Sequence, residues 1–185
     1  MGIISGSSNK VIRNNASHPG LTGISINPGF TVDENGVPTG QCGPLSLMNQ
    51  VVNNEFTNKS VFAVSLSAGC SGNGVINNTL SISGSIGNDL ELGNDDYNGY
   101  PIGFPVATNN QIHANQIAGG TIGILLWPKT ADNVVTGNKF SGENPPLQGI
   151  VDEGTGNVVR GNPGFDPMTG RGALGGPHAI RTMKP

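Results

Sequence analysis

The stretch DNVVTGNKF, residues 132–140, carries the pattern that decides the fold: an apolar residue followed three positions later by asparagine. In this copy a second apolar residue, Phe140, comes two positions after the asparagine. Such self-similarity predicts a fold assembled from equivalent units. The pattern recurs in six segments: Val11–Asn14, Val51–Asn54, Val75–Asn78, Ile112–Asn115, Val135–Asn138 and Val159–Asn162.

The spacing of these asparagines gives the length of one unit. Successive copies are 40, 24, 37, 23 and 24 residues apart, so three steps share one length and two contain an insertion of 13 to 17 residues. Two or three short strands in a unit of this length are typical of one turn of a β-solenoid. Short runs with alternating apolar positions, mostly opened by a small residue, supply the strands: 2–4, 23–26, 63–66, 90–92, 123–126 and 149–151.

Stacking explains both features of the repeat. Each unit buries its inward apolar side chains only when the next unit lies on it. An asparagine at the same turn of each coil can bond its own backbone, tolerate a left-handed φ and pair with the asparagines above and below. The sequence therefore predicts an all-β, right-handed, single-stranded parallel β-helix of about six rungs. We expect Asn54, Asn78, Asn115 and Asn138 to form a column in it.

A β-sandwich built from hairpins is the alternative fold. It requires inside–outside alternation with two-residue turns, and Asn35-Gly36 is one such turn signal. Hairpins do not predict an asparagine that recurs at 23 to 24 residues. The recurrence therefore favours the solenoid.

The composition excludes several functions. Glycine is frequent, with 30 residues, charged residues make up 11% and the formal net charge is -3. No basic excess steers the chain to nucleic acid, and no stretch is apolar and long enough to span a bilayer. A phosphate loop, a serine nucleophile elbow and the histidine spacings of transition-metal sites are missing as well. We expect no nucleic-acid partner, no membrane partner and no metal site of this kind.

Residues 132–140 together with Gly149-Ile150 resemble the parallel β-helix repeat of the pectin-lyase-like superfamily. The resemblance covers residues 2 to about 164 and implies that the asparagine turn lies between the second and third strands of each coil. It also implies that the first strands and their flanking loops form the wall of a polysaccharide groove. The catalytic signatures of polygalacturonases, pectate lyases and alginate epimerases are absent, so activity does not follow from the resemblance.

Two insertions follow first strands and precede second strands, so they emerge on the same edge of the coil. They span residues 27–47 and 93–108 and could form one lobe or the lip of a groove. Long loops on a rigid scaffold are where function tends to reside. Cys42 and Cys70 belong to this edge, either as a disulfide or as two small buried thiols.

A cluster beside the second insertion is the candidate site. Its carboxylates could hold Ca²⁺ as a cofactor, or they could transfer a proton together with an amine. Its aromatic faces could stack on a sugar. In the alternative interpretation, Asp95 caps its own loop, Lys129 forms a surface ion pair and Trp127 covers the edge of the coil. The catalytic candidates are Glu91, Asp95, Asp96 and Lys129, and the substrate-binding candidates are Tyr97, Tyr100 and Trp127.

The row of outward residues on the groove wall gives this site little support. It consists of Ser25, Ser65, Glu91, Leu125 and Val151, which do not place two carboxylates across one bond as glycoside hydrolysis requires. On the second strands, His113 should point outward between Ile76 and Thr136, as an ordinary surface histidine.

Two functional hypotheses remain open. One is a carbohydrate-binding or polysaccharide-processing domain, part of a longer lyase, hydrolase or epimerase, secreted or at the cell surface, with a polysaccharide or surface glycan as its ligand. The other is a non-catalytic structural, adhesin-like or tailspike-like solenoid. Because residues 2–4 already form a first strand, we expect a further N-terminal segment or a partner chain to cover the first rung. The β-helix should span residues 1–164, with a cap or loose tail over 165–185.

Overall fold

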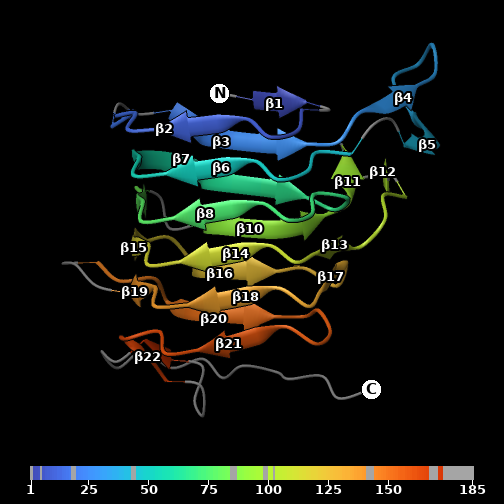
Figure 1. The fold of residues 1–185 in the computed structure, drawn as a ribbon. Helices are drawn as coiled ribbons and strands as arrows, with labels where there is room; N and C mark the ends of the chain where they lie inside the picture. Colours follow the sequence, from blue (N-terminus) through green and yellow to red (C-terminus); the bar gives the residue numbers. More distant parts are fainter. Residues whose placement is uncertain are drawn as a thin grey trace.

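The computed structural model of the chain is a parallel β-helix whose short strands stack rung on rung (Figure 1). It describes residues 2–4, 6–17, 20–42, 45–83, 87–97, 100–101, 103–140, 144–166 and 171–172. Every regular element within these ranges is a strand, and no helix among them could cross a membrane. The predicted fold class is confirmed.

Each turn of the chain contributes a first, a second and mostly a third strand, and strands of the same kind pair in parallel. The second strands form a six-stranded sheet: β2 (Lys10–Ile12), β6 (Gln50–Val52), β8 (Gly74–Ile76), β14 (Gln111–His113), β18 (Val134–Thr136) and β21 (Val158–Arg160). The first strands are β1 (Gly2–Ile4), β3 (Gly20–Asn27), β7 (Glu55–Ser67), β10 (Asn88–Asn94), β16 (Ile122–Leu126) and β20 (Gln148–Asp152). The third strands are β9 (Thr79–Ile82), β15 (Gln116–Gly119) and β19 (Lys139–Phe140), and they join the first strands in one nine-stranded sheet through the long β7.

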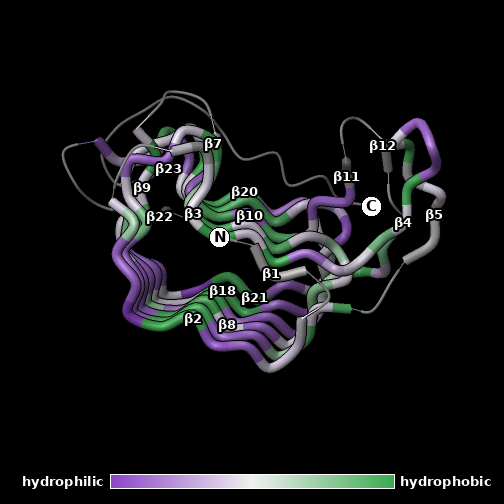
Figure 2. The backbone as a smooth tube through the Cα atoms, turned by 90° about the horizontal axis from the view of Figure 1, so that it is seen from above, coloured by the Kyte–Doolittle hydropathy of each residue, from purple (hydrophilic) through white to green (hydrophobic). Residues whose placement is uncertain are grey.

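Seen along its axis, the coil is a stack of similar turns with one lateral projection (Figure 2). The projection consists of two hairpins that arise from the two insertions. They are β4 (Phe30–Val32) with β5 (Pro38–Cys42), and β11 (Asp96–Tyr97) with β12 (Tyr100–Pro101). A short parallel pair, β13 (Ala107–Thr108) with β17 (Thr130–Ala131), lies at the same edge.

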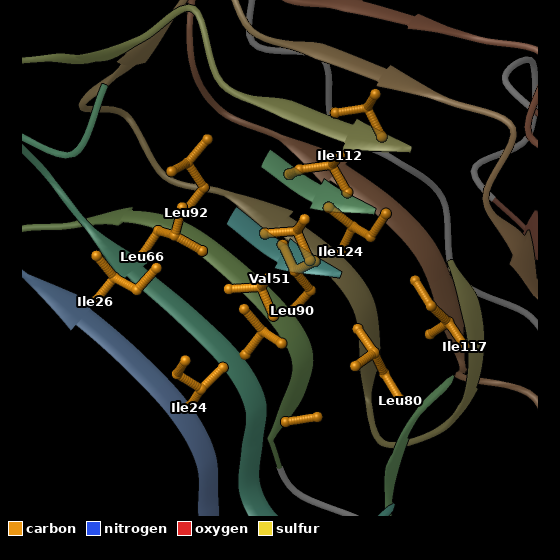
Figure 3. Packing of buried hydrophobic residues seen from close by; sticks show 14 of the residues in the cluster. Ile24, Ile26, Val51, Leu66, Leu80, Leu90, Leu92, Ile112, Ile117 and Ile124 are labelled. Atoms are coloured by element: carbon orange, nitrogen blue, oxygen red, sulfur yellow. The ribbon is translucent and has the colours of Figure 1, made fainter. Parts of the chain in front are cut away.

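Inward side chains form columns between the two walls (Figure 3). Ile24, Val64, Leu90, Ile124 and Ile150 occupy equivalent positions on successive first strands, and none is more than 1% exposed. The second strands supply the facing column from Val51 to Val135. Because each side chain packs on its equivalents one rung away, a single coil cannot bury its core, and stability is shared between neighbours.

The predicted asparagine column is present, and the hydrogen bonds between its asparagines all run in one direction. At each step the backbone N–H and the side-chain Nδ2 of one asparagine donate to Oδ1 of the asparagine on the next rung. From Asn78 to Asn115 both bonds measure 2.9 Å. Asn115 Nδ2 also donates backwards, to the Val75 carbonyl at 2.9 Å. The same pairing joins Asn14, Asn54, Asn78, Asn115, Asn138 and Asn162.

A second asparagine ladder, not predicted from the sequence, runs parallel to the first. Its members are Asn9, Asn49, Asn73, Asn110, Asn133 and Asn157. Each stands five residues before a member of the first ladder, so every three-residue second strand is bracketed by two asparagines. The two ladders fix both ends of these strands and thereby the corners of the coil.

The small residue that opens several first-strand motifs has a steric reason. A Cβ at Gly123 would lie 2.5 Å from Phe140 Cε1 and 2.8 Å from the Gly149 carbonyl oxygen. At Gly23 it would lie 2.3 Å from the Ala63 carbonyl oxygen. The backbone of the next rung therefore passes too close for any side chain at these positions.

Replacing Gly123 with alanine is expected to destabilise the fold by about 1–3 kcal/mol, the range for overpacking a well-filled core. Thermal unfolding followed by circular dichroism would show a Tm lower by several degrees. Gly20→Ala is the matched control, because its nearest neighbour would be Lys59 Nζ at 3.9 Å. Equal Tm values for the two variants would contradict this steric explanation.

Cys70 carries a free, buried thiol, and its Sγ donates to the Ile26 carbonyl at 3.2 Å. The buried-thiol alternative therefore holds for Cys70, whereas the Cys42 side chain lies outside the described residues.

At the C-terminal end, β22 (Phe165–Asp166) and β23 (Arg171–Gly172) form an antiparallel hairpin that contacts β20. Residues 173–185 lie outside the described part of the chain.

Candidate functional site

The outward row on the first strands is aligned as predicted. Ser25, Ser65, Glu91, Leu125 and Val151 occupy equivalent positions on β3, β7, β10, β16 and β20. The row changes character along the helix, because its first three members are polar and its last two are apolar. Only the part on β3, β7 and β10 can therefore recognise a hydroxyl-rich ligand by hydrogen bonding.

Two further side chains extend this polar part, whose members form two separate hydrogen-bonded groups. Asn27 Nδ2 donates to Ser25 Oγ at 2.8 Å, and Ser67 Oγ donates to Asn27 Oδ1 at 2.5 Å. Ser65 Oγ donates to Glu91 Oε1 at 2.8 Å. Ser25, Asn27 and Ser67 are half-buried, whereas Ser65 and Glu91 are only 4% and 6% exposed. These five residues are termed the polar strip below.

The two insertions meet beside the polar strip and form one lobe, which is one of the two arrangements expected from their common edge. The Phe30 and Phe104 rings stack edge-to-face, with centroids 5.9 Å apart and an interplanar angle of 76°. Phe104 also packs against Ala68, at the end of β7, and β12 contacts β5. Apolar contacts thus anchor both hairpins on the coil and on each other.

Two catalytic candidates, Asp95 and Lys129, lie together at the base of this lobe. Lys129 Nζ forms an ion pair with Asp95 Oδ2 and donates to the Phe104 carbonyl at 2.8 Å. Asp95 also accepts hydrogen bonds from the backbone N–H groups of Phe104, at 2.8 Å, and Gly103, at 3.2 Å. The carboxylate thereby caps the loop that carries Phe104. These contacts match the alternative interpretation of both residues.

Asp95→Ala is expected to lower stability by about 1–3 kcal/mol, because two backbone N–H groups and one ammonium group lose a charged acceptor. Asp95→Asn retains an acceptor oxygen and should lose less than half as much. Urea unfolding of the two variants, followed by circular dichroism, checks this order. If asparagine proves as damaging as alanine, capping is not the role of Asp95.

The other candidates are not brought into the same contact network. Among the described residues, no hydrogen bond or ion pair joins Glu91 to Asp95 or Lys129. Trp127 follows β16, and its buried indole Nε1 has no hydrogen-bond partner in the part of the chain that the structure describes. Asp96, Tyr97 and Tyr100 lie on the β11–β12 hairpin, where Tyr97 and Tyr100 form a cross-strand pair, and their side chains lie outside the described residues. A catalytic role for these candidates stays a prediction.

On the opposite wall, His113 is exposed and sits between Ile76 and Thr136, as predicted. Its Nδ1 lies 3.0 Å from the Thr136 carbonyl oxygen and 3.1 Å from Thr136 Oγ1. Both contacts are local to neighbouring rungs, which agrees with an ordinary surface histidine.

The strand order, the ladders and the outward row define the class: a right-handed parallel β-helix of the pectin-lyase-like kind. Within that class the chain belongs to the NosD family, described as periplasmic copper-binding protein, whose family model matches residues 1–150. The periplasmic description agrees with the expected location outside the cytoplasm. Neither the curated proteins nor the solved structures provide a match to the chain.

The described residues do not assemble a site that suits copper. Within them, no group of three or more His, Cys, Asp or Glu side chains could hold a metal ion. Burial raises the pKa of the Cys70 thiol to about 12, which disfavours the thiolate that a metal requires. Met48 is 59% exposed, and the Nδ1 of His113 is held against Thr136.

Sequence reasoning missed two members of the polar strip, Asn27 and Ser67. Both stand near the ends of first strands, where a polar residue is also expected of a turn. The available signal was their place in the repeat: Asn27 and Ser67 follow Ser25 and Ser65 by two residues, so they point to the same outward face.

Proposed function

We propose that this chain is a non-catalytic, glycan-binding β-helix domain acting outside the cytoplasm, and that its ligand binds the half-buried end of the polar strip at the base of the lobe. The observation that carries the proposal is the hydrogen-bonded group of Ser25, Asn27 and Ser67. Within the described residues it leaves one Asn27 amide hydrogen and the Ser25 hydroxyl hydrogen for a ligand.

The arrangement suits an extended, hydroxyl-rich ligand. Parallel rungs repeat at about 4.8 Å, so polar groups on β3 and β7 stand at a regular spacing along the coil axis. The lobe rises from the same edge and offers a second wall. Such a surface can fix a polymer by several weak hydrogen bonds, in the way that sugar-binding grooves combine few polar groups with a rigid frame.

The contacts of Asp95 and Lys129 favour binding over catalysis. Both side chains are engaged in holding the loop that carries Phe104. General acid–base chemistry requires groups within hydrogen-bonding reach of the reacting atoms, free to exchange a proton with them. A binding role makes no such demand on these residues.

The test is binding of the intact protein to a panel of neutral and acidic polysaccharides, measured by isothermal titration calorimetry. The double variant Ser25→Ala and Asn27→Ala should weaken binding by at least about tenfold, the equivalent of roughly 1.4 kcal/mol. His113→Ala, on the opposite wall, is the control and should bind normally. Absence of binding to every polymer would overturn the proposal, and release of unsaturated uronates or reducing ends would show that the domain is catalytic.

A further inference from the structure

Glu91, in the outward row of the first strands, is a buried carboxylate with little to offset its burial. Its side chain is 6% exposed, and its Oε1 accepts one hydrogen bond, from Ser65 Oγ at 2.8 Å. Its Oε2 accepts none in the described part of the chain, and no ion pair between described residues includes Glu91. Withdrawing a carboxylate from water is costly unless a cation or several hydrogen-bond donors face it. The folded chain leaves this cost largely uncompensated.

Three other carboxylates at the same edge of the coil have local structural roles. Asp33 accepts hydrogen bonds from two backbone N–H groups of its own turn, both at 2.9 Å. Asp95 caps its loop and pairs with an ammonium group, and Asp152 accepts from the Gly154 backbone N–H at 3.0 Å. Glu91 caps nothing, because it lies within β10, which pairs with β7 on one side and β16 on the other. The local fold therefore gives no reason for a carboxylate at this position.

The second oxygen of Glu91 can be reached from outside. Among the described residues, the buried side-chain atoms that lack a hydrogen-bond partner are the Asp89 carboxyl oxygens and Trp127 Nε1. Glu91 Oε2 is not one of them, so this unpartnered oxygen is in contact with solvent. It lies two rungs, or about 10 Å, from Ser25 along the coil axis. A ligand bound at the half-buried end of the polar strip can therefore extend to Glu91.

The basic side chains of the described chain are placed where they do not compensate Glu91. Lys129, at the base of the lobe, is paired with Asp95 and with a backbone carbonyl. The others lie on or beside second strands, on a third strand, or on the stretch of β7 that pairs with a third strand: Lys10, Arg13, Arg160, Lys139 and Lys59. The charge that faces a ligand beside Glu91 is therefore negative.

On the basis of the proposed glycan binding, we further propose that the bound glycan carries free amino groups and that Glu91 Oε2 accepts a hydrogen bond from one of its ammonium groups. An ammonium group supplies both the missing positive charge and the missing donor. Ser25 and Asn27 would bind hydroxyl groups of the same chain. A polyuronate would instead bring its own carboxylate beside Glu91, so it should bind poorly.

The test is isothermal titration calorimetry of the intact protein with oligosaccharides of equal length built from glucosamine, N-acetylglucosamine or galacturonate. Measurement at about pH 6 keeps the free amines protonated. EDTA in the buffer removes divalent cations, which could otherwise bridge two carboxylates. Acetylation removes the charge of each amine and keeps the rest of the sugar. The glucosamine oligomer should bind at least about tenfold more tightly than the acetylated one, and the galacturonate oligomer should bind most weakly.

Two variants assign this preference to Glu91. Glu91→Gln keeps an acceptor oxygen for Ser65 and removes the charge, so it should weaken binding of the glucosamine oligomer by about tenfold and leave the acetylated oligomer unaffected. Its Tm should stay equal or rise, because an uncompensated buried charge is lost. Glu153→Gln is the matched control: Glu153 is exposed and follows β20, two rungs from β10, so this variant should keep the preference.

The outcomes separate this proposal from the proposed function. Equal affinity of the wild type for the two glucosamine-based oligomers overturns the amine proposal and leaves glycan binding standing. So does a preference that Glu91→Gln leaves intact, or tighter binding of the galacturonate oligomer. If none of the three oligosaccharides binds but another polymer does, the amine proposal again falls alone. If no polymer binds at all, the proposed function falls with it.

Discussion

Asn115→Ala is expected to lower the Tm by about 10 °C or more. The Asn115 side chain is fully buried and makes four hydrogen bonds, each 2.9 Å long, to Asn78, Asn138 and Val75. Alanine removes all four bonds, and Asn138 Oδ1 then keeps only the bond from the backbone N–H of residue 115. One unsatisfied buried polar group costs about 1–3 kcal/mol, so the total reaches about 4 kcal/mol or more.

The measurement is thermal unfolding by circular dichroism, and Asn144→Ala is the control. Asn144 is exposed, so the same loss of an amide should change the Tm by less than about 2 °C. A Tm for Asn115→Ala within that range would mean that the ladder does not stabilise the coil.

The ladder also shows why the fold could be predicted from the sequence. In a β-solenoid each contact between rungs is a contact between repeat-equivalent positions, so the period alone places Val75 under Ile112 and Asn78 under Asn115. The second ladder was not predicted, because the repeat pattern begins at the apolar residue and includes only the asparagine that follows it. Asn73 and Asn110 stand at the same period, two residues before that apolar position.

The site was less predictable, because its contacts are not repeat-equivalent. The common edge of the insertions predicted that they lie together, either as one lobe or as the lip of a groove. The stacking of Phe30 on Phe104 and the capping of the loop by Asp95 depend on how two irregular segments fold against each other. No periodic pattern encodes those contacts, so the sequence left the role of Asp95 open between proton transfer and capping.

The burial of Asp89 could not be predicted from the sequence for a related reason. An aspartate beside a turn is ordinarily a solvated residue, yet Asp89 is fully buried and neither of its carboxyl oxygens has a hydrogen-bond partner among the described residues. The neighbouring rung encloses it: a Cβ at Gly120 would lie 3.3 Å from Asp89 Oδ2. The burial therefore comes from residues about thirty positions away, which local sequence does not reveal.

Asp89→Asn is expected to stabilise the protein by several kcal/mol at pH 8 and to change it little at pH 4. Burial raises the pKa of the Asp89 carboxyl from 3.8 to about 9, with the nearby backbone of Ile82 opposing the shift. Between these two values the folded chain holds a proton that the unfolded chain has released. The contribution of the protonated Asp89 carboxyl to the unfolding free energy is therefore fully present below pH 3.8. It is lost as the pH rises toward about 9, by up to roughly 1.4 kcal/mol per pH unit.

Asparagine has nearly the shape of the protonated acid and cannot ionise, so the variant should lose this dependence on pH. Urea unfolding at about pH 4, 5, 6, 7 and 8 gives the slope of the unfolding free energy against pH for the wild type and for Asp89→Asn. Asp132→Asn is the matched control: Asp132 is exposed and has a φ of 54°, which asparagine also tolerates, so its slope should follow the wild type. Parallel profiles for Asp89→Asn and wild type would mean that the carboxyl is not held protonated in the folded chain.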